Sequence, residues 1–119
     1  MPKALPVIDI SAPVCCAPVA AGVMSDDDAL QIALRLKALA DPARVKIMSL
    51  LFGGAADGCN SGELAVAIGV GESTVSHHLN QLRNAGLVES TRRGTSVYHR
   101  PHRAAVAALV GVLDPNCCS

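Results

Sequence analysis

Aromatic side chains are almost absent from this chain of 119 residues, which has no tryptophan, one phenylalanine and one tyrosine. Proteins that bind single-stranded nucleic acid stack the bases on several aromatic rings, so the composition disfavours that class. A core without rings has to be built from aliphatic side chains and alanine. The hydrophobic content of 50% is ample for this, and we expect one domain, mainly of packed helices.

Long apolar runs are absent as well. No run reaches the roughly 18 residues that a membrane span requires. Four of the seven prolines fall in residues 1–24 and interrupt any secretory signal there. We therefore expect a cytoplasmic protein without membrane contact, in which the five cysteines serve metal or redox chemistry and not a disulfide framework. No nucleophile stands with a base and an orienting acid, so we do not expect an enzyme.

A net charge is the third missing feature, because ten basic residues balance ten acidic ones. This disfavours an indiscriminate nucleic-acid binder, but the charges are unevenly distributed. Residues 1–72 carry five Lys/Arg and eight Asp/Glu, a balance of −3; residues 73–119 carry five Arg and two acids, a balance of +3, together with all four histidines. We expect the positive part to contact phosphate.

The chain divides into an arm (residues 1–24), a domain (residues 25–113) and a short tail (residues 114–119). The arm is rich in proline and shows no helical period, so we expect it to be flexible. In the domain, Ser25 begins a helix that runs to Ala40, with three aspartates in its first turn. Asp41 and Pro42 suit the cap and first position of a second helix, which Gly53 and Gly54 end.

The middle of the domain predicts a helix-turn-helix. Asn60 and Glu63 form a capping box for one helix, which ends at Gly69, and a second helix runs over residues 72–85 before Gly86. Two short β-type runs follow, at residues 87–91 and 96–100. They predict a hairpin, or wing, whose connection at residues 92–95 carries two arginines at its tip.

The last helix, residues 102–113, is apolar on nearly every side. Such a helix has to be buried, yet a domain of this size leaves one of its faces uncovered. A symmetric partner would supply the cover. We therefore predict a mainly α winged helix-turn-helix with a small β-hairpin wing, which forms a homodimer through its first and last helices.

The helix over residues 72–85 has an apolar seam of Val75, Leu79 and Leu82, and polar side chains cover its other faces. Small hydroxyls, imidazoles, amides and guanidinium groups contact phosphates and base edges in DNA grooves, and Gln81 is suited to read adenine. A two-fold dimer requires double-stranded DNA with an inverted repeat, its half-sites about 34 Å or a multiple apart. The alternative is that these groups only solvate an exposed face. The predicted DNA-binding residues are Ser73, Thr74, Ser76, His77, His78, Gln81, Arg83, Arg92 and Arg93.

Two segments at the expected separation, residues 36–44 and 74–88, closely resemble the ArsR/SmtB family of metal-sensing winged-helix repressors. The wing with Arg92 and Tyr98 fits the same pattern, and the resemblance covers about residues 26–113. It implies a homodimer that blocks a promoter and leaves it when a metal or metalloid binds, most like the arsenic-sensing branch. That branch often carries a Cys-x-Cys pair where this chain has Asn60 and Gly62, with Cys59 one residue earlier. Zinc and nickel sensors place Asp, His and Glu ligands on the last helix, and residues 104–113 offer none of these.

The cysteines are the predicted metal ligands. Neighbouring residues have Cα atoms only ~3.8 Å apart, shorter than a disulfide usually needs, so Cys15 and Cys16 suit one shared ion with Cys59 as third thiolate. The resemblance implies As(III) or Sb(III), which take three sulfurs, and Cd, Pb and Zn remain alternative inducers. A repressor with a thiol redox switch is a further alternative. Cys117 and Cys118 are auxiliary ligands or idle, and the arm reaches Cys59 of its own chain or of the partner.

Overall fold

The computed structural model describes residues 23–113. Cys15 and Cys16, the predicted partners of Cys59, and the auxiliary or idle pair Cys117 and Cys118 lie outside these residues. Along the chain the elements are α1 (Asp26–Leu39), α2 (Pro42–Gly53), β1 (Cys59–Asn60), α3 (Ser61–Ile68), α4 (Glu72–Asn84), β2 (Val88–Arg93), β3 (Ser96–Pro101) and α5 (Arg103–Leu113).

Short-range hydrogen bonds set the starts of the first three helices. The Ser25 hydroxyl accepts from the amide of Asp28 at 3.2 Å, and the Asp41 carboxylate accepts from the amide of Ala43 at 2.8 Å. At α3 the capping box is complete, because Asn60 and Glu63 each accept from the other's amide, at 2.8 and 2.9 Å. These bonds satisfy amides that a helix start leaves without partners, and they confirm the predicted boundaries.

The described residues form a three-stranded antiparallel sheet in the order β1-β3-β2. The strand β1 was not expected, because two residues are too few to show the alternation of a β-type run. Its two residues pair with β3, Cys59 opposite His99 and Asn60 opposite Tyr98. The predicted wing tip was also wrong in detail: Arg92 and Arg93 lie within β2, where ladder pairing holds them, and the turn itself is Gly94 and Thr95.

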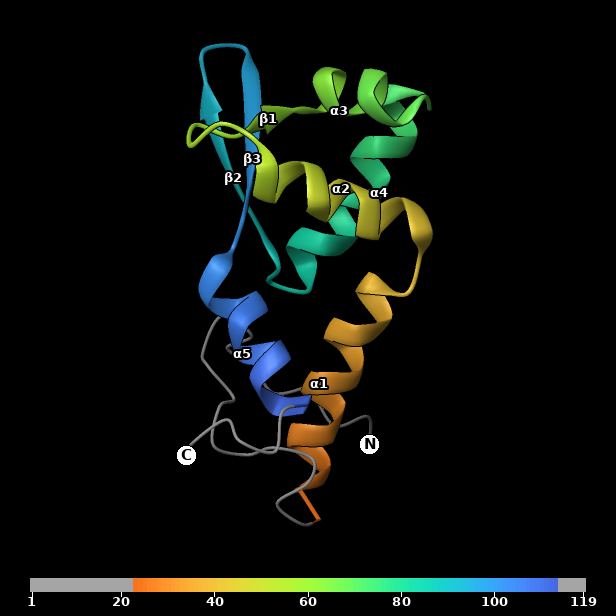
Figure 1. Cartoon of the computed structure of the whole chain (residues 1–119), viewed down its shortest axis with the longest axis vertical. Helices are drawn as coiled ribbons and strands as arrows, with labels where there is room; N and C mark the ends of the chain where they lie inside the picture. Colours follow the sequence, from red (N-terminus) through yellow and green to blue (C-terminus); the bar gives the residue numbers. More distant parts are fainter. Residues whose placement is uncertain (1–22, 114–119) are drawn as a thin grey trace, which may run out of the picture.

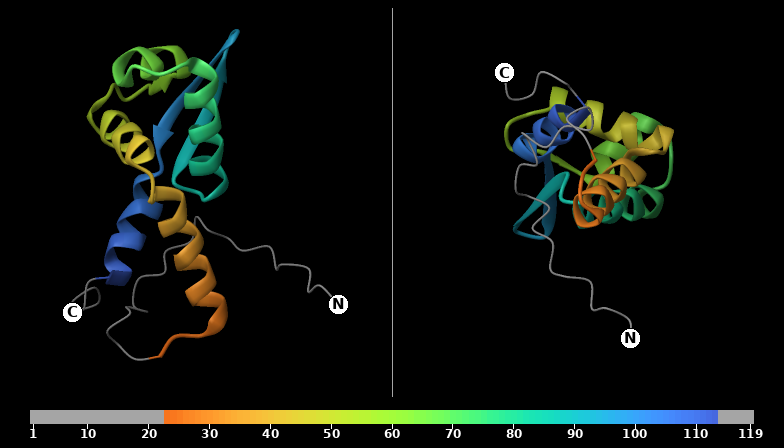
Figure 2. Two further views of the ribbon diagram at one scale, coloured as in Figure 1. Left: turned by 90° about the vertical axis from the view of Figure 1, so that its right-hand side faces the viewer. Right: turned by 90° about the horizontal axis from the view of Figure 1, so that it is seen from below.

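The elements are arranged along one long axis (Figure 1). The sheet, α3 and the start of α4 lie toward one end, α2 crosses the middle, and α1 and α5 lie together at the other end in both Figure 1 and Figure 2. The core is aliphatic, as expected, and the seam of α4 is part of it: Val75, Leu79 and Leu82 expose 2% of their surface or less. The winged helix-turn-helix is thus built on α3, α4 and the β2-β3 hairpin.

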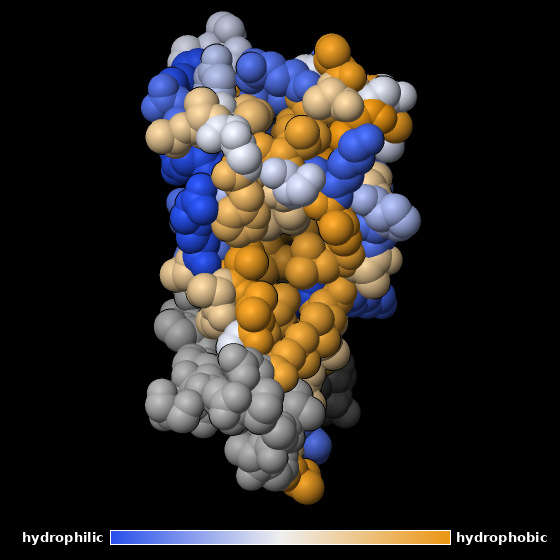
Figure 3. Space-filling model, in the orientation of Figure 1, coloured by the Kyte–Doolittle hydropathy of each residue, from blue (hydrophilic) through white to orange (hydrophobic). Residues whose placement is uncertain are grey.

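One surface of the molecule is markedly apolar. Figure 3 shows hydrophobic residues from the middle of this face down toward the end that carries α1 and α5. On α1 the side chains of Leu30, Leu34 and Leu36 are exposed, and on α5 so are Val110 and Leu113, by 63% and 56%. None of the helices described is both long and apolar enough to cross a membrane.

Candidate nucleic-acid interface and cysteine site

Helix α4 presents most of the predicted DNA-binding side chains. Ser73, Thr74 and His77 are exposed and Ser76 is half-buried, while the apolar seam behind them is buried. The N-cap is Gly71, which has no side chain to accept from the first amides of the helix. Amides at an uncapped helix start point outward together with the positive end of the helix dipole, an arrangement suited to a phosphate.

His78 lies apart from the other predicted DNA-binding residues. It is half-buried, and its Nδ1 accepts a hydrogen bond of 3.1 Å from Nε of Arg44 on α2. The Arg44 guanidinium also donates from Nη1 to the carbonyl of Ala38 in α1, at 3.3 Å. One arginine thus connects the last turn of α1 with the middle of α4, and His78 holds α4 against the other helices.

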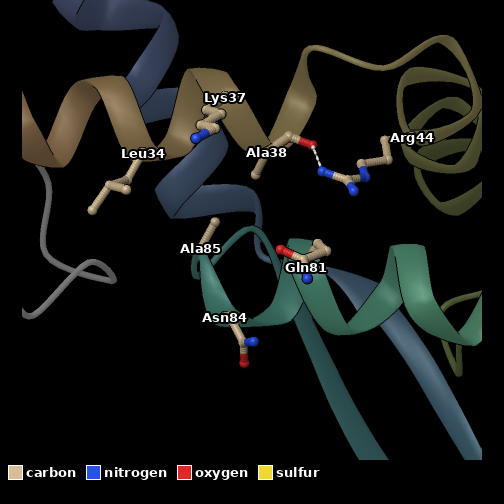
Figure 4. Close-up of a pocket in the computed structure, with 7 residues that line it drawn as sticks. All are labelled: Leu34, Lys37, Ala38, Arg44, Gln81, Asn84 and Ala85. Atoms are coloured by element: carbon tan, nitrogen blue, oxygen red, sulfur yellow. Dashed lines mark hydrogen bonds between the residues drawn. The ribbon is translucent and has the colours of Figure 1, made fainter.

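A hollow of about 280 Å³ lies where these helices meet, between α1, the start of α2 and the C-terminal half of α4. Gln81 and Asn84 of α4 line this hollow, and Figure 4 shows the bond from Arg44 to the Ala38 carbonyl at the end of α1. Gln81 therefore lies on the part of the exposed face of α4 that is nearest to α1. Arg83 is exposed and donates to the side chain of Asn80 one turn earlier.

The two wing arginines differ in their surroundings. Arg93 pairs with Asp57 in the loop before β1, at 3.1 Å, and its guanidinium stacks over the ring of Tyr98, 4.9 Å from the centroid. Arg92 is exposed beside it on β2. Because successive side chains of a strand point to opposite faces, Arg92 and Arg93 lie on opposite faces of the hairpin. Arg93 thus links the wing to the loop before β1, and both arginines are exposed.

Cys59 stands at the junction between the loop, the sheet and α3. Its side chain is half-buried and packs on Gly54, where even an added Cβ would lie only 3.1 Å from the sulfur. Burial and, second, the nearby Glu63 carboxylate raise the pKa of the thiol. Within residues 23–113 no three His, Cys, Asp or Glu side chains come together to hold an ion.

His99, opposite Cys59 on β3, is a buried polar residue that the sequence did not single out. It is 5% exposed, and its Nδ1 lies 2.8 Å from the hydroxyl of Ser90 on β2. Its Nε2 lies 3.4 Å from the hydroxyl of Ser61, the first residue of α3. Burial and, second, the charge of Arg83 lower the pKa of this ring. A histidine inside an alternating β-run was the only signal that could have revealed it.

Residues 41–90 match the family described as "Bacterial regulatory protein, arsR family". The chain is 46% identical over 77 residues to the transcriptional repressor SmtB homolog of Synechocystis sp.; the match covers 65% of this chain and 56% of that protein, so the chain spans little more than half of its length. It is 33% identical to the HTH-type transcriptional regulator YgaV of Escherichia coli, covering 74% of this chain and 87% of that one.

Solved structures agree. The winged helix-turn-helix DNA-binding domain Mb0332 from Mycobacterium bovis, described as homodimeric and as a possible ArsR-family regulator, is 34% identical. It superposes with a TM-score of 0.61 over 73% of this chain and 82% of its own. The expectation of a winged helix-turn-helix and the expectation that the chain is not an enzyme are both confirmed. The chain belongs to the arsR family of bacterial regulatory proteins.

Proposed function

We propose that this protein is a dimeric transcriptional repressor that binds double-stranded DNA and releases it when a thiophilic ion binds its cysteines. The observation that carries the DNA-binding part is α4. Its apolar seam is buried, its polar face is exposed and its first turn has no side-chain cap. The exposed Arg92 on the adjoining wing adds a positive group for the neighbouring phosphates.

Dimerisation is proposed to use α1 and α5. Five large aliphatic side chains of these two helices are exposed on the single chain. Exposed leucines and valines gathered on neighbouring helices mark an interaction surface. A two-fold contact there would place two copies of α4 on the same DNA, which then has to carry an inverted repeat. The named Mycobacterium bovis domain, which is described as homodimeric, supports this proposal.

The ion site is proposed to consist of Cys59, Cys15 and Cys16. The half-buried sulfur of Cys59 lies at the start of α3 and lacks nearby His or acidic ligands in sufficient number within the described residues. Two adjacent thiolates from the arm would complete a set of three sulfurs, which suits As(III) or Sb(III). Family membership leaves the ion open, so this choice depends on the donor atoms. Cd, Pb and Zn are the alternative inducers, and Cys117 and Cys118 remain possible auxiliary ligands.

The state of the Cys59 thiol bears on the redox alternative. Peroxide and persulfide sensing uses thiolates with a lowered pKa in positive surroundings. Burial and Glu63 instead raise the pKa of Cys59. These surroundings do not activate Cys59 toward an oxidant, and an ion that bound this thiol would have to displace its proton.

The test measures the affinity of the purified protein for operator DNA with and without arsenite. Cys59→Ser, Cys15→Ser and Cys16→Ser are each expected to bind DNA normally and to lose release, and Cys117→Ser with Cys118→Ser tests the tail. Release that survives all three single changes would overturn the ion site. Substituting Cd²⁺, Pb²⁺ and Zn²⁺ for arsenite ranks the inducers by the same readout.

Mixing two variants locates the arm. A heterodimer of Cys15→Ser/Cys16→Ser with Cys59→Ser contains one complete site if the arm crosses to the partner. It contains none if the arm binds its own chain. Near-ultraviolet absorbance on adding arsenite counts the sites directly, without DNA.

A further inference from the structure

Three polar side chains form one row across the sheet. Cys59 on β1 is opposite His99 on β3, and His99 is opposite Ser90 on β2. Directly opposite residues of antiparallel strands lie on the same face with their Cβ atoms about 5 Å apart. The thiol, the imidazole and the hydroxyl are therefore neighbours in a line across all three strands, which lie side by side in Figure 1.

The middle member of this row bridges two separate parts of the DNA-binding unit. One ring nitrogen of His99 lies 2.8 Å from the Ser90 hydroxyl in the wing, and the other lies 3.4 Å from the Ser61 hydroxyl in the first turn of α3. A neutral imidazole has one donor and one acceptor nitrogen, and a hydroxyl can take either role, so both contacts are satisfied at once. Because the ring is buried, water cannot replace either hydroxyl, so breaking one contact leaves a ring nitrogen without a hydrogen-bond partner and costs free energy.

The backbone on both sides of Cys59 is closely constrained by α3 and β3. Asn60 is both the second residue of β1 and the N-cap of α3, so no loop separates the sulfur from that helix. On the other side, Gly58 has a φ of 96° and lies so close to β3 that an added Cβ would be 2.6 Å from the carbonyl oxygen of His99. A force applied at Cys59 is therefore passed to β3 and to the first turn of α3.

We propose that His99 is a positioning residue that couples occupancy of Cys59 to the placement of α3 and of the wing. The inference rests on the proposed role of Cys59 as an ion ligand. An ion bound at Cys59 that displaced β1 would separate Ser61 from the ring of His99, which would stay on β3 with its contact to Ser90. The wing and the helix-turn-helix then no longer hold the relative position that fits DNA.

The experiment separates coupling from binding. The coupling is the ratio of operator dissociation constants with and without arsenite, and typical allosteric ratios are about 5- to 150-fold. Ser61→Ala and His99→Phe are expected to reduce this ratio by about tenfold. Arsenite binding to the DNA-free protein, followed by near-ultraviolet absorbance, should keep its stoichiometry. Ser49→Ala is the matched control, because its exposed hydroxyl donates to the carbonyl of Lys46 in its own helix.

A double-mutant cycle completes the test. If the Ser61 contact acts through His99, the double variant loses no more coupling than either single variant. Unchanged coupling in Ser61→Ala, Ser90→Ala and His99→Phe would overturn the proposal, as would equal loss in Ser49→Ala. If His99→Phe does not fold, the two serine variants decide alone. Failure of the proposed ion site has a different signature, because Cys59→Ser would then still respond to arsenite.

Discussion

Replacing Gly58 by alanine should separate β1 from β3, and three other glycine positions make the size of the effect predictable. Gly58 has a φ of 96°, and a Cβ there would lie 2.6 Å from the carbonyl oxygen and 3.1 Å from the carbonyl carbon of His99. A side chain at positive φ costs roughly 1–2 kcal/mol. Relief of a backbone contact this close adds an overpacking cost of roughly 1–3 kcal/mol. The expected loss of unfolding free energy is therefore about 2–5 kcal/mol.

The controls isolate the two contributions. Gly69 and Gly94 also have positive φ, 75° and 62°, but an added Cβ at either position meets nothing within 4 Å. Gly69→Ala and Gly94→Ala should thus cost only the conformational part, roughly 1–2 kcal/mol. At Gly53, in the last turn of α2, there is neither strain nor contact, so alanine should be neutral or stabilise by up to about 1 kcal/mol.

The assay is urea unfolding followed by helical circular dichroism, at one protein concentration because a dimer's stability depends on it. In a domain of this size each kcal/mol moves the melting temperature by about 4–8 °C. The Cys59 thiol should also react faster with an alkylating reagent in folded Gly58→Ala than in the parent. If Gly58→Ala is no less stable than Gly69→Ala, the close approach of β1 to β3 is refuted.

Three further outcomes are expected. Asn60→Ala should lower the free energy of unfolding by about 1 kcal/mol, because the capping box is lost. Asn60→Asp keeps the acceptor and should be as stable as the parent. Equal stability of the parent and both variants would contradict the cap. Because the pKa of His99 is lowered in the fold, the unfolded chain takes up the proton more readily, so stability should be greatest above the ordinary histidine pKa of about 6.5 and fall as pH drops below it. Urea midpoints at several pH values should show this slope in the parent and a flatter one in His99→Gln. Arg92→Ala should weaken DNA binding and reduce the slope of log affinity against log salt concentration by about 1. Arg93→Ala should have a smaller effect, because Arg93 contacts Asp57 and Tyr98. The reverse order would show that Arg93 contacts DNA.

The contact from Arg44 to His78 changes how the recognition helix is understood. From the sequence, His77 and His78 both appeared to lie on the DNA face. In the fold only His77 is exposed, and His78 receives a hydrogen bond from α2. Since Arg44 also bonds to the last turn of α1, a shift of that helix would be transmitted to α4.

Local chemistry allowed the sequence by itself to determine the elements and their order. Caps, glycine stops and the 3.6-residue period act within a few residues, so Ser25, Asp41, Asn60 and Gly86 marked helix boundaries that the structure confirms. The buried seam of α4 followed from spacing alone. The candidate DNA-binding residues were likewise named from the polar positions of one helix and one hairpin.

Tertiary structure decided what depends on contacts distant in the chain. A strand of two residues has too little sequence to show a period, so β1 exists only because β3 pairs with it. That pairing places Cys59 beside His99, 40 positions later, and brings Ser61 and Ser90 to the same ring. The partners of Arg44 and Arg93 were hidden for the same reason: a guanidinium is recognisable in the sequence, but whether it contacts a carbonyl, an imidazole or a carboxylate depends on how the elements pack.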